Sequence, residues 1–202
     1  MNQTICVYSS SSTAIDPHYF ETATQLGQAM ASRGDELLYG GGMIGLMGAI
    51  AEAVRENGGK VTGVIPKALN LPGIVYENCD ELIVTEGMRE RKAMMDARSD
   101  AFIALPGGYG TLEELLEIIT LKQLKYHNKP IVILNVNHFY DPLLAQFDLI
   151  IRQRFAKTES QDLYFVTDSI ADTLQYIDSY VPFQFSDKWL EPRTTNIERD
   201  KG

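Results

Sequence analysis

The 202-residue sequence has few of the features that mark secreted or membrane-bound proteins. Only two cysteines are present, Cys6 and Cys79, so we expect no disulfide framework and two reduced thiols. No apolar run approaches the ~20 residues of a membrane span. The start, MNQTICVYSS, lacks the basic and apolar segments of a signal peptide. The sequence therefore predicts a cytoplasmic protein with no membrane partner.

Basic residues are also scarce, since 18 Lys and Arg stand against 27 Asp and Glu. The net charge of -9 argues against a nucleic-acid polymer as partner, because such proteins present a positive surface. It does not argue against a small anion, because a helix N-terminus and a few local cations bind phosphate on an acidic protein.

Residue patterns for metal or acyl-transfer chemistry are missing as well. His18, His127 and His138 have no H-x-x-H spacing and no cysteine partner, so no metal site is expected. Neither G-x-S-x-G nor a Cys/His pair is present, which disfavours a nucleophilic acyl transferase.

What the sequence does contain is a regular alternation of strand and helix patterns. Apolar, β-branched runs predict six strands, over 4–8, 36–39, 61–65, 82–85, 101–105 and 131–134, and a candidate seventh strand over 164–166. Between them, apolar periodicity and capping signals predict helices over 17–33, 45–56, 89–98, 111–125, from 141, and over 170–180. This pattern predicts one α/β domain over 1–183, with a mostly parallel sheet of about seven strands and helices on both faces. Residues 184–202 form a polar tail, expected to be mobile or docked through Trp189.

Ligands of parallel sheets bind outside the carboxyl ends of the strands. Three loops lie there: Ser9–Ser12, Gly40–Gly45 and Pro106–Gly110. Gly40–Gly45 matches G-x-G-x-x-G, but the third strand ends Ile65-Pro66-Lys67 without the acid that would hold a ribose of NAD. A mononucleotide phosphate on backbone N–H groups fits this loop better than NAD, and a purely structural tight turn is the alternative.

The loop Pro106–Gly110 leads into a helix whose first residues include Thr111, Glu113 and Glu114. Thr111 and Glu114 have the spacing of a capping box, so a purely structural role and a functional one remain open here. In either case the helix dipole is expected to keep Glu114 ionised. An ionised carboxylate suits orienting a water or stabilising a cationic transition state.

A basic cluster, Arg89, Arg91 and Lys92, begins the helix at 89–98. Cations are disfavoured at a helix N-terminus, so the cluster opposes local preference. Two interpretations remain open, a solvated face with salt bridges to Glu86 and Glu90, and an anion-binding site.

These stretches together carry a family resemblance. YGGGMIGLMGAIAEAV, VTGVIPKAL, GMRERKAMMDARSDAFIALPGGYGTLEELLEIIT and QLKYHNKPIVILNVNHFYDPLL resemble the Lonely Guy (LOG) family of nucleotide phosphoribohydrolases and its bacterial relatives. The pairing of M-x-x-R-K with P-G-G-x-G-T-x-x-E is the specific part of the match. The resemblance implies a Rossmann-like fold, a homodimer, and hydrolysis of a purine nucleoside 5′-monophosphate to base and ribose 5-phosphate. It implies neither metal nor other cofactor.

Carried over residue by residue, the resemblance places the family's catalytic pair at Arg91 and Glu114. With the strand-end loops, the expected substrate- and phosphate-binding residues are Ser11, Gly41, Gly42, Lys92, Gly107, Gly108, Tyr109, Gly110, Thr111, Glu113 and Thr120.

The sequence departs from the family pattern in three places. Arg89 stands where the family commonly has His, Ser9–Ser12 replaces Cys-Gly-Ser-Ser, and Gly73 falls where relatives place a substrate-contacting Glu. Two other classes compete with hydrolysis. A pyridoxal-phosphate lysine decarboxylase, an older label for this fold, would need a Schiff-base lysine that no motif indicates. A non-catalytic nucleotide or cofactor carrier is the other.

Overall fold

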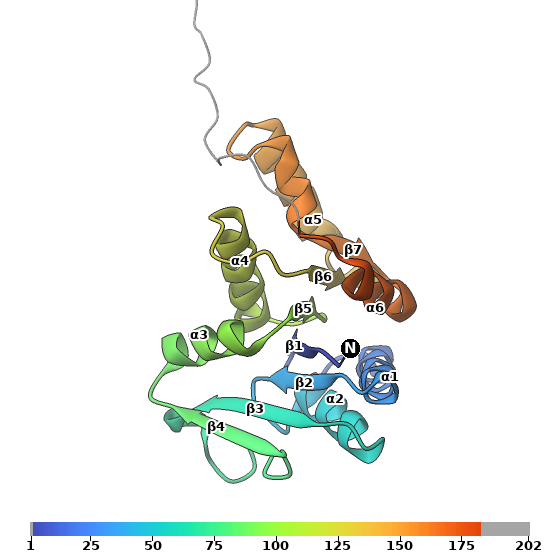
Figure 1. Ribbon diagram of the computed structural model, residues 1–202, viewed down its shortest axis with the longest axis vertical. Helices are drawn as coiled ribbons and strands as arrows, with labels where there is room; N and C mark the ends of the chain where they lie inside the picture. Colours follow the sequence, from blue (N-terminus) through green and yellow to red (C-terminus); the bar gives the residue numbers. More distant parts are fainter. Residues whose placement is uncertain (1, 183–202) are drawn as a thin grey trace, which may run out of the picture.

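The computed structural model describes residues 2–182, so the expected tail at 184–202 and Trp189 lie outside the described residues. Within 2–182 the chain forms a seven-stranded sheet in the order β4-β3-β2-β1-β5-β6-β7, and every neighbouring pair is parallel (Figure 1). The strands are β1 (Thr4–Tyr8), β2 (Glu36–Tyr39), β3 (Val61–Pro66), β4 (Glu81–Thr85), β5 (Ala101–Ala104), β6 (Ile131–Leu134) and β7 (Phe165–Thr167). The predicted α/β, Rossmann-like fold class is confirmed.

Six α-helices connect these strands within the described range, with three short 3₁₀ segments. The helices are α1 (Pro17–Arg33), α2 (Gly45–Glu56), α3 (Met88–Arg98), α4 (Tyr109–Gln123), α5 (Asp141–Arg152) and α6 (Ile170–Ser179). The 3₁₀ segments are η1 (Lys67–Leu69), η2 (Val136–His138) and η3 (Thr158–Leu163).

Local sequence explains where the first helix begins and ends. The Asp16 carboxylate accepts a hydrogen bond from the His18 N–H at 2.9 Å, and Pro17 supplies a preset φ at the first helical position. Gly34 ends the helix in the left-handed region, at φ 77°, where glycine carries no steric penalty.

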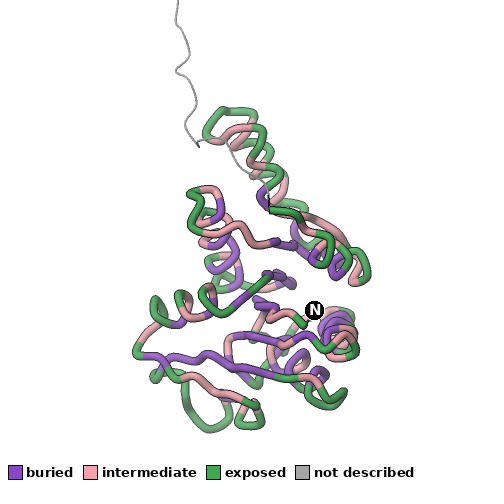
Figure 2. Tube along the Cα trace, in the orientation of Figure 1, coloured by how far each residue is buried: buried purple, intermediate pink, exposed green. Residues whose placement is uncertain are grey.

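The helices cover both faces of the sheet, because alternate strand residues point to opposite sides. Ile5 and Val7 of β1 pack with the core formed under α1, α2 and α6. Cys6 and Tyr8 of the same strand pack with the core formed under α3, α4 and α5. All four side chains are buried, as are most strand positions in Figure 2.

The strand order changes direction beside β1. The chain runs outward through β2, β3 and β4 and then returns to place β5 on the other side of β1. At such a switch point the connections leave in opposite directions and open a crevice outside the carboxyl ends of the strands. The loops after β1 and β5 therefore flank the expected ligand position.

Candidate functional site

Arg91 and Glu114 meet between α3 and α4. Arg91 Nη1 donates to Glu114 Oε1 at 2.6 Å, and the two residues are 7% and 8% exposed. Arg91 Nε also donates to the Val64 carbonyl of β3 at 2.9 Å. The pair predicted as catalytic is thus brought together as a buried, hydrogen-bonded ion pair.

Glu114 is buried beside a cation, and its pKa reflects both surroundings. Burial raises the pKa of Glu114 above its usual value, although the Arg91 charge and hydrogen bond work in the opposite direction. Removing a carboxylate from water penalises its charged form, whereas a nearby cation favours that form. That Glu114 is ionised at neutral pH stays a prediction.

The proposed capping box is also wrong. α4 begins at Tyr109, two residues earlier than the sequence suggested, and its N-cap is Gly108 with no side-chain cap hydrogen bond. Thr111 therefore lies inside the first turn and Glu114 in the second. Glu114 does not cap the helix, and its side chain bonds to Arg91 instead.

The other cations of the cluster separate. Lys92 forms ion pairs with Glu113 and Glu117 of α4, not with Glu86 or Glu90. Arg89 is exposed. The interpretation with salt bridges to Glu86 and Glu90 is therefore wrong for Arg91 and Lys92. α3 and α4 pack side by side, and their facing charges pair between the two helices.

The loop Pro106–Gly110 is shaped by close packing at one end and open space at the other. A Cβ on Gly107 would lie 2.1 Å from Thr111 Oγ1, so only glycine fits there. A Cβ on Gly108 or Gly110 would meet no atom within 4 Å, and Tyr109 is 94% exposed. The uncapped start of α4 thus borders open space beside the pair.

The Gly40–Gly45 loop contacts the serine loop after β1, where a phosphate cradle would leave its N–H groups open to a ligand. The Ser10 carbonyl accepts hydrogen bonds from the N–H groups of Leu46 and Met47, at the start of α2. Gly45, at φ 69°, lies so close to this serine loop that a Cβ would be 2.6 Å from the Ser11 backbone. The start of α2 is therefore occupied by the chain's own backbone.

Gly41 and Gly42 contact the connection that follows η1. The Gly41 carbonyl accepts from the Tyr76 N–H at 2.9 Å, and Gly42 forms an isolated β-bridge with Val75. Gly73, in the same connection, has φ 79°, and a Cβ there would meet nothing within 4 Å. A glutamate at this position would be strained by the backbone, whatever the space around it.

Thr120 is the predicted binding residue that the described chain places furthest along α4. Its exposed hydroxyl donates to the Leu116 carbonyl at 2.7 Å. It lies almost two turns beyond Glu114, about 9 Å along the helix axis. The structure does not bring Thr120 to the ion pair.

A cavity of about 260 Å³ opens beside Glu114, between α3 and α4. Tyr8, Lys92, Asp96 and Glu117 line it together with Glu114. Tyr8 and Asp96 were not identified from the sequence, because Tyr8 reads as an ordinary strand residue and Asp96 as a helix-surface acid. Only the strand order, which puts β1 beneath both helices, brings them to this place.

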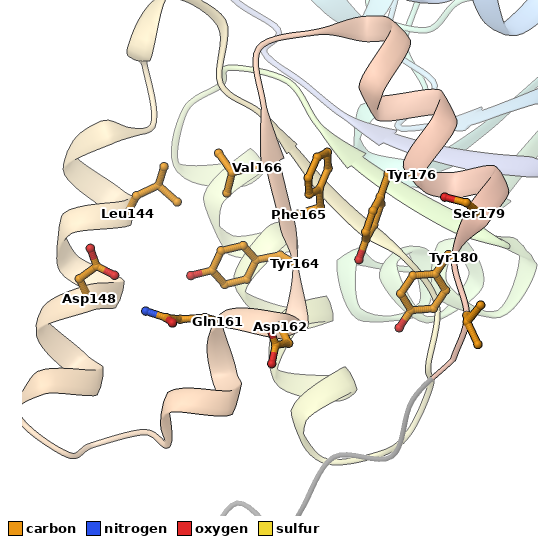
Figure 3. Close-up of a pocket in the computed structure, with 11 residues that line it drawn as sticks. Leu144, Asp148, Gln161, Asp162, Tyr164, Phe165, Val166, Tyr176, Ser179 and Tyr180 are labelled. Carbon is orange, nitrogen blue, oxygen red and sulfur yellow. The ribbon is translucent and has the colours of Figure 1, made fainter.

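Figure 3 shows a second cavity, of about 800 Å³, on the β7 side of the sheet between α5 and α6. Tyr164, Tyr176 and Tyr180 line it with the carboxylates of Asp148 and Asp162, and none of its described lining residues is Lys or Arg. A site with two carboxylates and no cation is unsuited to a phosphate. The cavity beside Glu114 also has carboxylates, but it is lined by the Lys92 cation as well, and this makes it the better candidate for an anionic ligand.

Comparison with known proteins assigns the family. The model for a family described as "Possible lysine decarboxylase" matches residues 47–177. The chain is 45% identical over 191 residues to the "probable" cytokinin riboside 5′-monophosphate phosphoribohydrolase LOGL1 of Oryza sativa subsp. japonica, covering 95% of this chain and 84% of the relative. It is 43% identical over 178 residues to the cytokinin riboside 5′-monophosphate phosphoribohydrolase LOG2 of Arabidopsis thaliana, covering 88% and 84%.

The chain belongs to the LOG family.

Solved structures extend this likeness to binding proteins of the same fold. The molybdenum cofactor binding protein of Rippkaea orientalis has a TM-score of 0.67 at 26% identity, covering 89% of this chain and 97% of that one. The molybdenum cofactor carrier protein of Chlamydomonas reinhardtii has a TM-score of 0.67 at 22% identity, covering 88% and 97%, which shows the shared fold alone. The identity to the LOG enzymes is much higher than to either carrier.

Within residues 2–182 no group of three or more His, Cys, Asp and Glu side chains is arranged to hold a metal ion. In the same range no helix has the length and apolar character of a membrane span.

Removing Arg91 should destabilise the protein in a pH-dependent way. Arg91 lowers the pKa of Glu114 against the effect of burial, so Arg91→Met raises this pKa further. The penalty on folding is absent below the pKa of the unfolded chain, grows as the pH rises towards the raised pKa of the folded protein, and is complete above it. We expect a loss of about 3–5 kcal/mol in the free energy of unfolding at pH 8 and a clearly smaller loss at pH 5. Urea unfolding at the two pH values measures this.

The matched control is Arg98→Met on the same helix. Arg98 forms a two-bonded ion pair with Glu81, but both side chains are more than a third exposed. Its loss should stay below about 1 kcal/mol at both pH values. Equal losses for Arg91→Met at pH 5 and pH 8 would contradict the role assigned to Glu114 burial.

Proposed function

We propose that this protein hydrolyses the N-glycosidic bond of purine nucleoside 5′-monophosphates, releasing the free base and ribose 5-phosphate. The observation that carries the proposal is the buried Arg91–Glu114 ion pair beside the open start of α4. The named activities of the relatives, which act on cytokinin riboside 5′-monophosphates, support the same reaction. AMP-like and cytokinin ribotides are the substrate class.

In the proposed reaction the bond between C1′ of the ribose and the base nitrogen breaks, and its electron pair leaves with the base. Water is divided between the products: its hydroxyl goes to C1′ and one proton goes to the base nitrogen. Positive charge develops on the ribose, as in other glycoside cleavages. Glu114 as a carboxylate stabilises this charge and accepts a proton from the attacking water, whose oxygen bonds to C1′. Burial raises the pKa of Glu114, and this makes it a stronger base than an exposed carboxylate.

Arg91 has two parts in this proposal. Its ion pair keeps Glu114 available as a carboxylate despite burial. Its remaining donors provide positive charge beside an anionic nucleotide. Lys92 adds a second cation from the next position of α3, and the N-terminal amides of α4 add the positive end of a helix dipole. These groups suit a 5′-phosphate and would have no counterpart in a neutral nucleoside.

The carrier alternative is less favoured by the same features. A carrier needs to bind without cleaving, and it gains nothing from a carboxylate whose pKa is raised by burial next to the ligand. The relatives that the chain matches at 43–45% identity are named hydrolases, whereas the carriers match at 22–26%.

Nucleotide turnover is the direct test. The purified protein is incubated with AMP, adenosine, a prenylated adenine ribotide and other nucleoside monophosphates, and chromatography scores the free base. We expect release from the monophosphates and at least about 10-fold slower release from adenosine, because a lost charged hydrogen bond costs roughly 1.5–3 kcal/mol. Equal rates on AMP and adenosine would contradict the proposed recognition of the 5′-phosphate. Binding of nucleotides without release of base would favour the carrier function.

Glu114→Gln isolates the carboxylate. The amide keeps the size of the side chain but neither stabilises cationic charge nor accepts the proton of water. We expect base release to fall 10²-fold or more, while circular dichroism and the unfolding midpoint show a folded protein. Glu113→Gln changes the neighbouring acid of α4, which is paired with the half-buried Lys92, and tests whether any nearby acid has the same effect. Wild-type turnover by Glu114→Gln would exclude the proposed role.

We also propose that the protein forms a homodimer through α4 and α5. α5 has no fully buried residue within the described part of the chain, and its Leu144 and Phe147 are only partly buried where they pack on the core. Leu116 of α4 and Leu149 of α5 are 42% and 40% exposed. Apolar faces of this kind on neighbouring helices are typical of an isologous interface.

Sedimentation at micromolar concentration tests the dimer. We expect a dimer for the wild type and a monomer for Leu116→Glu combined with Leu149→Glu, because each copy would place charges at the apolar contact. Val84→Glu is the control, since Val84 is 42% exposed on the edge strand β4. A monomeric wild type would reject the proposal without touching the catalytic one.

A further inference from the structure

Gly40 directly follows β2 and lies next to the guanidinium of Arg91. A Cβ built on Gly40 would lie 2.2 Å from Arg91 Nη2 and 3.4 Å from Arg91 Cζ. Non-bonded heavy atoms normally approach to about 3.5–4.0 Å. The guanidinium therefore occupies the volume that any side chain at position 40 would need.

The backbone of Gly40 does not itself require glycine. The glycines of this loop with positive φ are Gly41, at 73°, and Gly45, at 69°, and Gly40 is not among them. An alanine at position 40 is therefore compatible with the backbone. The space taken by Arg91 is the main feature that excludes it; Met47 Sδ, 3.1 Å from the same Cβ, belongs to a flexible side chain that needs to shift by only a few tenths of an ångström.

Arg91 is held in place on its other sides. Its Nε is bonded to the Val64 carbonyl at 2.9 Å and its Nη1 to Glu114 at 2.6 Å. Its own N–H is bonded to the Gly87 carbonyl at 3.0 Å within the first turn of α3. A side chain at position 40 thus has to displace the guanidinium from at least one of these partners.

We propose that Gly40 is a positioning residue for Arg91. Because position 40 has no side chain, the Arg91 guanidinium lies directly against the backbone at the end of β2. In this position its Nη1 donates to Glu114. The first glycine of the Gly40–Gly42 run thereby acts through Arg91 and not as part of a phosphate cradle. This inference rests on the proposed function only where activity is the readout.

Gly40→Ala is the first test. With the guanidinium displaced from Glu114, we expect kcat/KM for AMP to fall by about 10–100-fold, since small misplacements of catalytic groups cost up to about 10²-fold. Because Arg91 lowers the pKa of Glu114, the acidic limb of the pH–rate profile should also move to higher pH. A merely local packing defect would not move that limb.

A double-mutant cycle shows whether the effect passes through Arg91. Lysine lacks the branched nitrogens, so an alanine at position 40 has no Nη2 to displace in the Arg91→Lys background. We expect Gly40→Ala to change kcat/KM less than about 2-fold in that background. Gly87→Ala is the matched control, because its Cβ would meet nothing within 4 Å and its extended φ of -158° suits any residue.

A readout independent of activity separates this proposal from the proposed function. Carbon NMR of the labelled Glu114 carboxyl follows its titration in wild type and Gly40→Ala, and we expect the higher midpoint in the variant. If wild type releases no base but the midpoint moves, the proposed function fails and the positioning role stands. If Gly40→Ala does not fold, adding Arg91→Lys should restore folding. An unchanged midpoint and pH profile, or an equal loss in the Arg91→Lys background, would overturn the inference.

Discussion

The burial of one guanidinium sets the architecture of this site. A charge removed from water is tolerated only where its polar groups find partners of good geometry, and the Arg91 guanidinium finds them on two separate elements, next to a third that leaves it room. Val64 of β3 supplies a carbonyl, Glu114 of α4 a carboxylate, and Gly40 at the end of β2 the space. The helix that carries Arg91 follows β4, at the far edge of the sheet. α3 must therefore lie back across the sheet for the site to exist at all.

In the proposed function the same pair is what separates catalysis from binding on this fold. A molybdenum cofactor binding protein has a similar fold, so fold alone does not decide between the two functions. What matters is a carboxylate held in two opposing environments. Burial favours its neutral form and Arg91 its charged form, and a group balanced in this way exchanges a proton more readily than one fixed in either state. The 800 Å³ cavity beside β7 offers tyrosines and acids but no such balance.

Sequence reasoning predicted the alternation of elements and the parallel sheet well, because each leaves a local pattern in the chain. The pairing of Arg91 with Glu114 came instead from the family resemblance. Sequence reasoning failed where two distant segments meet. The spacing of Thr111 and Glu114 is that of a capping box, yet α4 begins at Tyr109 and Glu114 turns to a partner 23 positions earlier. The glycine run at 40–45 likewise suggested a phosphate loop. In the structure Gly40 instead makes room for Arg91, and Gly45 makes room for the backbone of Ser11, two contacts that no local pattern reveals. The two paired motifs were enough to indicate the family. How the residues of these motifs lie relative to one another is determined by the fold.

The strand order has a consequence for how the protein acquires its site during folding. β1 is made first but lies in the middle of the sheet, and its neighbour β5 is separated from it by the whole excursion through β2, β3 and β4. Loop closure over such distances is slow compared with the formation of a helix. The contact between Arg91 and Glu114 requires both α3 and α4 to lie on the sheet, on either side of β5 in the chain. The proposed site therefore depends on long-range docking, and a chain that has formed its helices without placing them on the sheet lacks it.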